Sequence, residues 1–272
     1  MEADSLPMIA VDGARIVYRL IGKGRPLVVL NGFGATSADW DPSLIDRLAS
    51  SNELILLDNR GIGGSTDDGQ PFDIAKLADD AAHVIETLGS EHVSLLGWSM
   101  GGFIAQALAL KYADRINKLV LLSTDPGGVE ADLASPDVWS GLLDTSGTPN
   151  EQARRLLFLL FPRDVAESFY RRFGDIVAAA RAQLSVELLN RQADAMDAWH
   201  RNGVAGQLRE IRVPVLIAAG TEDIVIPASN ALKLANAIPG AWLAQFPHGG
   251  HAFMAQYPRA LADLINSFLA IE

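Results

Sequence analysis

The 272-residue sequence contains no cysteine, and this absence removes several kinds of chemistry at once. Without thiols the chain has no disulfide framework, no cysteine nucleophile and no cysteine-ligated metal site. It also lacks any apolar run near the roughly 18 residues that a membrane-spanning helix needs. The residues after Met1 do not show the basic-then-apolar pattern of a secretory signal peptide. We therefore expect a cytoplasmic protein that does not enter a membrane.

Basic residues are scarce relative to acidic ones. The chain has 22 lysines and arginines against 33 aspartates and glutamates, which gives a formal net charge of −11. Nucleic acid phosphates and anionic membrane surfaces repel such a chain, so neither is an expected partner. The charge is spread along the sequence without an acidic or basic tail. The expected partner is a small molecule, and the protein is expected to be a monomer or a homodimer.

The apolar content is sufficient for a substantial core, with 49% hydrophobic and 20% charged residues. At about 150 residues per domain, the length corresponds to roughly 1.8 domains, although α/β folds of 200–250 residues often form one. One core with a large insertion is therefore the first interpretation.

Short aliphatic runs recur along the chain and alternate with helical patterns. They are too continuous for strands with one exposed face, which predicts a mostly parallel sheet of about eight strands with helices on both faces. The runs are residues 27–30, 54–57, 93–96, 119–122 and 215–219, with a short strand at 242–246. The expected helices are 74–88, 100–112, 228–237 and 252–270. A hairpin with its turn at Asp12 and Gly13 precedes them as an antiparallel edge.

The alternation stops between residues 126 and 206, where only helical patterns occur. The expected helices are 151–161, 165–173 and 186–200, with boundaries at Pro136, Pro149, Pro162 and Gly174. We therefore predict a discontinuous core, residues 1–125 and 207–272, and a helical cap, or lid, of residues 126–206.

The strongest local motif is Gly-Trp-Ser-Met-Gly-Gly at residues 97–102, which follows a predicted strand and begins a predicted helix. A nucleophilic serine, here Ser99, needs a sharp turn that lifts its hydroxyl above the sheet edge. Gly97 and Gly101 would let the neighbouring backbone approach, and the helix amides would point toward a developing oxyanion. The alternative interpretation, a tight glycine turn without chemistry, is disfavoured by the strand before it and the helix after it.

A serine nucleophile also needs a base and an acid that orients the base. His251 lies in a glycine-flanked loop after strand 242–246, and Asp223 directly follows strand 215–219. Parallel strands carry such loops to one edge of the sheet, so both side chains are expected near Ser99. Asp125, which follows the strand ending near Ser123, is an alternative acid.

With these motifs the sequence resembles the α/β-hydrolase fold superfamily, within its branch of capped serine esterases, lactonases and carbon–carbon bond hydrolases. The order of Ser99, Asp223 and His251 is that of the superfamily's triad. Residues 58–65, Asp-Asn-Arg-Gly-Ile-Gly-Gly-Ser, are similar to its Asp-x-Arg-Gly-x-Gly-x-Ser loop, where Asp58 and Arg60 are expected to brace the loop. The resemblance covers the chain outside the helical insertion.

The loop after the first aliphatic run departs from the superfamily pattern, because Asn31-Gly32-Phe33-Gly34 stands where relatives have His-Gly. By position, the resemblance implies an oxyanion hole made by the backbone amides of Phe33 and Met100. Trp98 and Phe33 are expected to form pocket walls. Most of the aromatic and methionine side chains of the insertion are expected to pack the cap, and the rest to line the pocket. They are Trp139, Phe158, Phe161, Phe169, Phe173, Met196 and Trp199.

These features imply a serine hydrolase that cleaves small to medium apolar carboxylic esters or lactones through an acyl-enzyme on Ser99. No metal and no organic cofactor is expected. One alternative is hydrolysis of a carbon–carbon bond in a diketone-like substrate by the same residues. Another is a ligand-binding receptor built on a hydrolase fold with little turnover. A dinucleotide site is not predicted, because the glycines after Arg60 do not match the Gly-x-Gly-x-x-Gly pattern.

Overall fold

The computed structural model describes residues 6–271. Residues 1–5 and 272 lie outside this range, and with them the first residues of the predicted core. Among the described residues no helix combines the length and the apolar character needed to cross a membrane.

Eight strands form one sheet in the order β1-β2-β4-β3-β5-β6-β7-β8. The first two pairings, β1 with β2 and β2 with β4, are antiparallel, and the other pairings are parallel. The predicted mostly parallel sheet with an antiparallel edge is therefore confirmed. The strands are β1 (Met8–Val11), β2 (Ala14–Gly22), β3 (Arg25–Leu30), β4 (Asn52–Leu57), β5 (Val93–Trp98), β6 (Ile116–Leu122), β7 (Val215–Gly220) and β8 (Trp242–Phe246).

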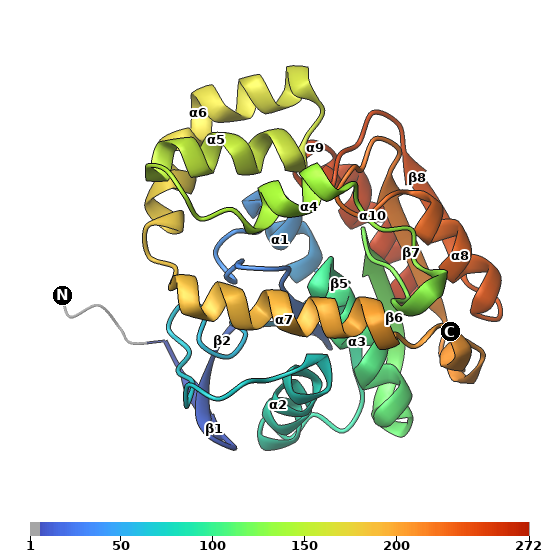
Figure 1. Cartoon of the computed structure of the whole chain (residues 1–272). Coiled ribbons are helices and arrows are strands. Elements are labelled where there is room, and N and C mark those ends of the chain that lie inside the picture. The colour runs from blue at the N-terminus through green and yellow to red at the C-terminus, as the bar shows by residue number, and fades with distance from the viewer. Residues whose placement is uncertain (1–5, 272) are drawn as a thin grey trace.

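Helices cover both faces of this sheet, as the continuous apolar strands predicted (Figure 1). One face packs against α2 (Ile74–Thr87), α3 (Met100–Lys111) and α8 (Ser229–Ala237). The opposite face packs against α1 (Pro42–Ala49) and α10 (Pro258–Ala270). Side chains of the central strands are consequently buried on both sides, and apolar burial of this kind is the main stabilising contribution to the fold.

Four α-helices occupy the connection between β6 and β7, which we call the insert (residues 123–214). They are α4 (Pro136–Leu143), α5 (Pro149–Leu160), α6 (Arg163–Arg181) and α7 (Val186–Asn202). Figure 1 shows α4, α5 and α6 together at one end of the molecule and α7 running beneath them. Three short 3₁₀ turns, Ala113–Arg115, Gly128–Glu130 and Ala205–Glu210, complete the described elements.

Local sequence explains where the insert helices begin. Pro136 and Pro149 each stand in the first turn, where a missing amide costs no intrahelical bond. Thr148 caps α5 through its side chain, and Glu151 bonds back to the Thr148 amide to complete a capping box. The predicted proline boundaries are thus confirmed.

Two predicted helix boundaries were wrong. Gly174 lies inside α6 and not at its end, and a Cβ there would come within 2.9 Å of the Tyr170 ring. The glycine therefore permits close side-chain packing within a continuous helix. The last predicted helix is divided into α9 (Phe253–Gln256) and α10, because Pro258 has no amide hydrogen to continue α9.

Candidate active site

Ser99 lies between β5 and α3 in a backbone conformation that few residues other than glycine adopt, with φ 56° and ψ −122°. Close backbone contacts impose the glycines on either side. A Cβ on Gly97 would lie 2.3 Å from the Gly101 carbonyl oxygen, and one on Gly101 would lie 2.2 Å from that of Leu30. The turn is therefore strained and held by the surrounding sheet, as positions that present a reactive side chain often are.

Asp223 and His251 come from the loops after β7 and β8, which are neighbouring strands. The His251 Nδ1 atom lies 2.9 Å from Asp223 Oδ2, and both side chains are buried. The amides of Val225 and Ile226 each donate to Asp223 Oδ1 at 2.9 Å. Because these bonds fix the carboxylate and engage Nδ1, the ring nitrogen left for a reacting group is Nε2.

Ser99 and His251 line the same cavity. No hydrogen bond joins their side chains, both of which belong to the described part of the chain; such contacts commonly tighten only when a substrate is bound. Two contacts hold the histidine loop in place. Trp98 Nε1 donates to the His251 carbonyl oxygen at 3.0 Å, and the Ala252 amide donates to the carbonyl oxygen of Leu160 at the end of α5, also at 3.0 Å.

Phe33 and Met100 place two backbone amides beside Ser99. A Cβ on Gly32 would lie 3.3 Å from Ser99 Cβ, so the loop that carries Phe33 passes directly next to the serine. Met100 is the first residue of α3, where an amide has no acceptor within its own helix. Within residues 6–271 neither amide donates to a protein acceptor. Both amides therefore lack a protein partner in this part of the chain, and Phe33 also lines the cavity that contains Ser99.

Asn31, which stands where the family resemblance implies a histidine, holds this loop in place. Its side chain donates from Nδ2 to the Leu57 carbonyl oxygen at 2.7 Å and accepts at Oδ1 from Trp40 Nε1 at 2.7 Å. The Asn59 side chain donates to the Asn31 carbonyl oxygen. The fully buried asparagine thus connects the loop to β4 and to a tryptophan of the cavity wall.

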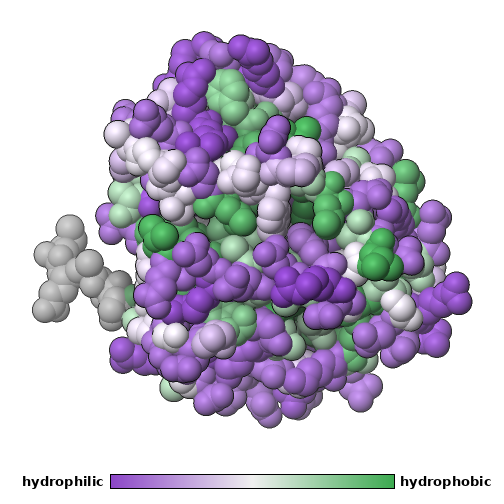
Figure 2. Space-filling model, in the orientation of Figure 1, coloured by the Kyte–Doolittle hydropathy of each residue, from purple (hydrophilic) through white to green (hydrophobic). Residues whose placement is uncertain are grey.

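The cavity has a volume of about 420 Å³, within the range of small-molecule sites. Trp98 and Phe33 line it, and so do three of the aromatic residues singled out in the insert, Phe161, Phe169 and Phe173. Because α5 and α6 supply much of the remaining wall, these helices lie over the carboxyl ends of the strands. In Figure 2 apolar surface also gathers in a band between the upper helices and α7.

Four of the singled-out residues do not line the cavity. They are Trp139, Phe158, Met196 and Trp199. Trp199, for example, stacks on Phe103 of α3 with ring centroids 5.1 Å apart. Conversely, Trp40, Met254 and Arg181 line the cavity although the sequence analysis did not single them out. Arg181 ends α6, where a basic residue is ordinarily explained by the helix dipole, so no local signal pointed to it.

Asp125, the alternative acid, does not contact His251. It accepts hydrogen bonds from the Gly127 amide at 2.7 Å, from Trp199 Nε1 at 3.3 Å and from His200 Nε2 at 3.3 Å. Its side chain therefore connects the end of β6 to α7, away from the Asp223–His251 contact.

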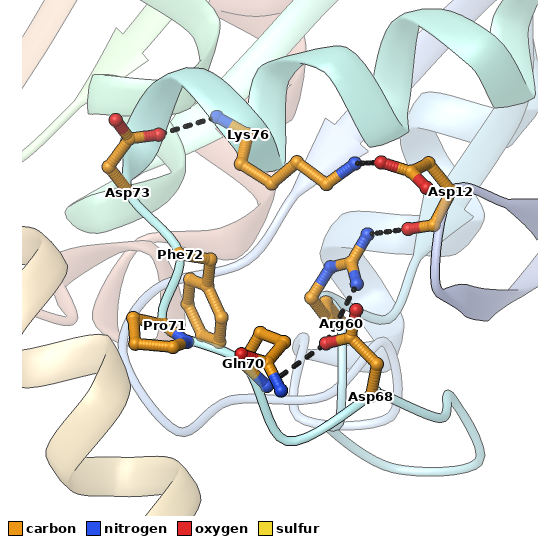
Figure 3. Close-up of a pocket in the computed structure, with 8 residues that line it drawn as sticks. All are labelled: Asp12, Arg60, Asp68, Gln70, Pro71, Phe72, Asp73 and Lys76. Atoms are coloured by element: carbon orange, nitrogen blue, oxygen red, sulfur yellow. Dashed lines mark hydrogen bonds and ion pairs between the residues drawn. The ribbon is translucent and has the colours of Figure 1, made fainter.

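A second cavity, polar and about 520 Å³ in volume, surrounds Arg60 (Figure 3). The buried Arg60 guanidinium forms two 2.8 Å bonds to Asp80 and a third bond to the Asp12 carbonyl oxygen. Its hydrogen bonds to Asp80 raise the pKa of Arg60 above its usual value. Lys76 pairs with Asp12 at 2.9 Å at the rim. The positive charges of this cavity, Arg60 and Lys76, are both paired with carboxylates. Such pairing is what a bracing role of Arg60 would require.

His248 lies three residues before His251 and bridges the core and the insert. Its Nδ1 lies 2.8 Å from Glu222, and its Nε2 lies 3.1 Å from Asp164 at the start of α6. Hydrogen bonds to these two carboxylates raise the pKa of His248, and the bond to Glu222 has the larger effect. Among the described residues no cluster of three or more histidine, aspartate or glutamate side chains is placed to hold a metal ion.

The sheet order, the strained serine turn and the aspartate–histidine contact together define a class of proteins. The sequence model of the family described as alpha/beta hydrolase fold matches residues 25–256, and the chain belongs to this family.

Similar proteins include RutD of Azorhizobium caulinodans, provisionally named a carbamate hydrolase, which is 29% identical over 97% of this chain and 98% of its own. The crystal structure of a hydrolase from Pseudomonas aeruginosa PA01 is 29% identical, with a TM-score of 0.83 over 99% of this chain and 100% of that one. The enol-lactonase of Burkholderia xenovorans LB400 is 25% identical, with a TM-score of 0.86 over 97% and 100%. Family and relatives identify the chain as a hydrolase.

Proposed function

We propose that this hydrolase uses Ser99 as a nucleophile to cleave small to medium carboxylic esters or lactones with an apolar body. One observation carries the proposal: a serine in a strained turn and a histidine oriented by a buried aspartate line one cavity together with Phe33, and the Met100 amide, which has no acceptor among the described residues, directly follows the serine. We further propose a cytoplasmic monomer or homodimer that needs no cofactor.

In the proposed reaction His251 Nε2 accepts the Ser99 proton while Oγ attacks the substrate carbonyl carbon. Asp223 keeps Nδ1 protonated and stabilises the imidazolium that forms. The amides of Phe33 and Met100 donate to the developing oxyanion, each contributing about 2.7–4 kcal/mol. The tetrahedral intermediate collapses to an acyl-enzyme, and the leaving alkoxide takes the proton from His251. Water, deprotonated by the same histidine, then attacks the acyl carbon. The Ser99 oxygen leaves with the proton from His251 as the acid is released.

Covalent labelling tests the nucleophile directly. A fluorophosphonate should phosphonylate Ser99 and no other serine, as read by mass spectrometry of tryptic peptides, and ester hydrolysis should stop in proportion. Ser99→Ala should abolish both. Ser123→Ala is a matched control, because Ser123 is also buried and also has a positive φ, of 43°, but does not line the cavity. A folded wild type that binds substrate-like ligands and leaves Ser99 unlabelled would contradict the proposal.

A substrate panel tests the proposed bond. Esters and lactones with apolar acyl chains should be turned over with higher kcat/KM than an alkyl carbamate or a vinylogous diketone. The carbamate belongs in the panel because one relative is named for it, and the diketone because the same residues support carbon–carbon cleavage. Faster diketone cleavage would replace the ester assignment while retaining Ser99 and His251 in their roles.

A further inference from the structure

Arg181 brings a positive charge into a cavity whose other walls are mostly apolar. It is the last residue of α6, and its side chain lines the cavity together with Phe173, Val177 and Leu184. The Arg181 Nε atom is buried and has no hydrogen-bond partner. Among the described residues no carboxylate lies within ion-pair distance of its guanidinium. A buried donor left in this state is uncommon, because burial without a partner costs free energy.

Neighbouring charges do not compensate Arg181. Burial is the main cause that lowers the pKa of Arg181, and the nearby positive charge of Arg155 lowers it further. No carboxylate of the described residues raises this pKa in compensation. The two aspartates on the cavity wall are used elsewhere. Asp39 accepts from the amide and hydroxyl of Thr36, and Asp41 caps α1. The guanidinium thus faces the cavity as an uncompensated cation.

The Arg181 guanidinium lies beside the loop that contributes to the proposed reaction centre. A Cβ on Gly34 would lie 3.5 Å from an Arg181 terminal nitrogen, so the guanidinium contacts the loop that presents the Phe33 amide. This loop is fixed from the other side, because the Gly34 amide donates to Gln192 Oε1 at 2.9 Å. A carboxylate bound to Arg181 would therefore be separated by only a short spacer from a carbonyl group of the same ligand placed beside Ser99.

We propose that Arg181 binds a carboxylate of the substrate, so that the preferred esters or lactones carry a free carboxylate a few bonds from the carbonyl that is attacked. The planar guanidinium suits two parallel bonds to a carboxylate, and the apolar walls suit the methylene spacer. Arg181 is thus a specificity-determining residue, and the inference rests on the proposed serine hydrolase function. An arginine that only packs its aliphatic stem would not discriminate between charged and neutral substrates.

Two esters of matched shape test this assignment. In mono-4-nitrophenyl glutarate a carboxylate occupies the place of the isopropyl group of 4-nitrophenyl 5-methylhexanoate. The wild type should hydrolyse the glutarate ester with at least about tenfold higher kcat/KM. Arg181→Gln should lower kcat/KM for the glutarate ester about 100-fold, mainly through KM, and change that for the neutral ester less than about threefold. Arg181→Lys keeps the charge without the planar fork and should fall between.

Arg171→Gln is the matched control. It removes one positive charge from the same helix, but its side chain is 72% exposed and pairs with Glu167 outside the cavity. Both esters should react with this variant as with the wild type. If Arg181→Gln lowers both esters equally, or if the wild type prefers the neutral ester, the carboxylate assignment is wrong while the serine mechanism stands.

A binding measurement covers the remaining outcomes. Glutarate should slow fluorophosphonate labelling of Ser99 in the wild type and not in Arg181→Gln or Arg181→Met, whose thermal midpoints show that they are folded. Equal protection in all three proteins, or in none, contradicts the assignment even if neither ester is a good substrate. Absence of labelling together with absence of turnover would instead contradict the proposed function.

Discussion

Asp125 and Asp223 are buried aspartates that follow neighbouring strands, β6 and β7, and each contacts one histidine. The surroundings of the two imidazoles differ. The His251 ring lines the cavity beside Ser99, whereas the His200 ring packs against Phe103 and Trp139 and does not reach the cavity. An aspartate–histidine contact therefore does not define a catalytic pair. What defines it is the group that the second ring nitrogen can reach.

The sheet explains why His251 meets Asp223. The loops after β7 and β8 touch closely, since a Cβ on Gly220 would lie 2.2 Å from the Gly249 carbonyl oxygen. The Glu222 amide donates to that same oxygen at 2.8 Å. His200 instead comes from α7, so its contact with Asp125 connects a helix of the insert to the core. We expect Asp223 to control the rate of ester hydrolysis and Asp125 to control the stability of the fold.

The largest expected effect separates the two aspartates by activity. Asp223→Asn preserves shape but favours the wrong imidazole tautomer, and should lower kcat for ester hydrolysis about 10⁴-fold. Asp125→Asn, the matched change, should lower kcat less than about tenfold. Steady-state kinetics on proteins with unchanged circular dichroism measure both. The reverse ranking would transfer the role of orienting acid to Asp125.

An intermediate effect concerns unfolding. Asp125→Ala removes the acceptor of Trp199 Nε1, His200 Nε2 and the Gly127 amide, and should lower the free energy of unfolding by about 1–3 kcal/mol. Urea titration followed by tryptophan fluorescence measures this. Trp199→Phe removes only one of these bonds while retaining the aromatic stack, and should cost less. An unchanged urea midpoint in Asp125→Ala would show that the contact does not stabilise the fold.

The smallest effect concerns His248, the exposed third histidine that contacts carboxylates. Its carboxylate partners raise its pKa above the ordinary value of about 6.5, so the folded state favours the protonated ring. The resulting stability is fully present below about pH 6.5 and is lost as pH rises through the raised pKa. His248→Asn, which tolerates the φ of 53°, should lower the thermal midpoint at pH 6 and have little effect at pH 9. If the thermal midpoints of the wild type and His248→Asn differ more at pH 9 than at pH 6, the protonated ring does not stabilise the fold.

The sheet and the serine turn could be predicted because their signals are local. Continuous aliphatic runs indicate strands covered on both faces, and the glycines around Ser99 follow from contacts between adjacent segments. The choice between Asp125 and Asp223 does not follow from a local signal, because it depends on which strand lies beside β8. That neighbour is set by the order of strands in the sheet, which no single segment encodes.

The part of the cavity wall that the insert supplies could not be assigned from the sequence, as α5 and the residue that follows it show. Phe158 and Phe161 are three residues apart and have the same chemistry, yet only Phe161 lines the cavity. The Arg154 guanidinium instead lies over the Phe158 ring, with its central carbon 4.8 Å from the ring centroid. Helical periodicity identifies an apolar face, but the placement of α5 against α6 and the core decides what that face contacts. Arg181 was missed because a basic residue in the last turn of a helix is ordinarily explained by the helix dipole.

The bond from the Ala252 amide to the Leu160 carbonyl oxygen ties the insert to the loop that carries His251. It joins the end of α5 to the residue after His251, and a Cβ on Gly250 would lie 2.4 Å from the same oxygen. Lifting α5 to admit a substrate would pull on the loop that holds the base. The placement of the His251 imidazole therefore depends on how α5 is seated against the core.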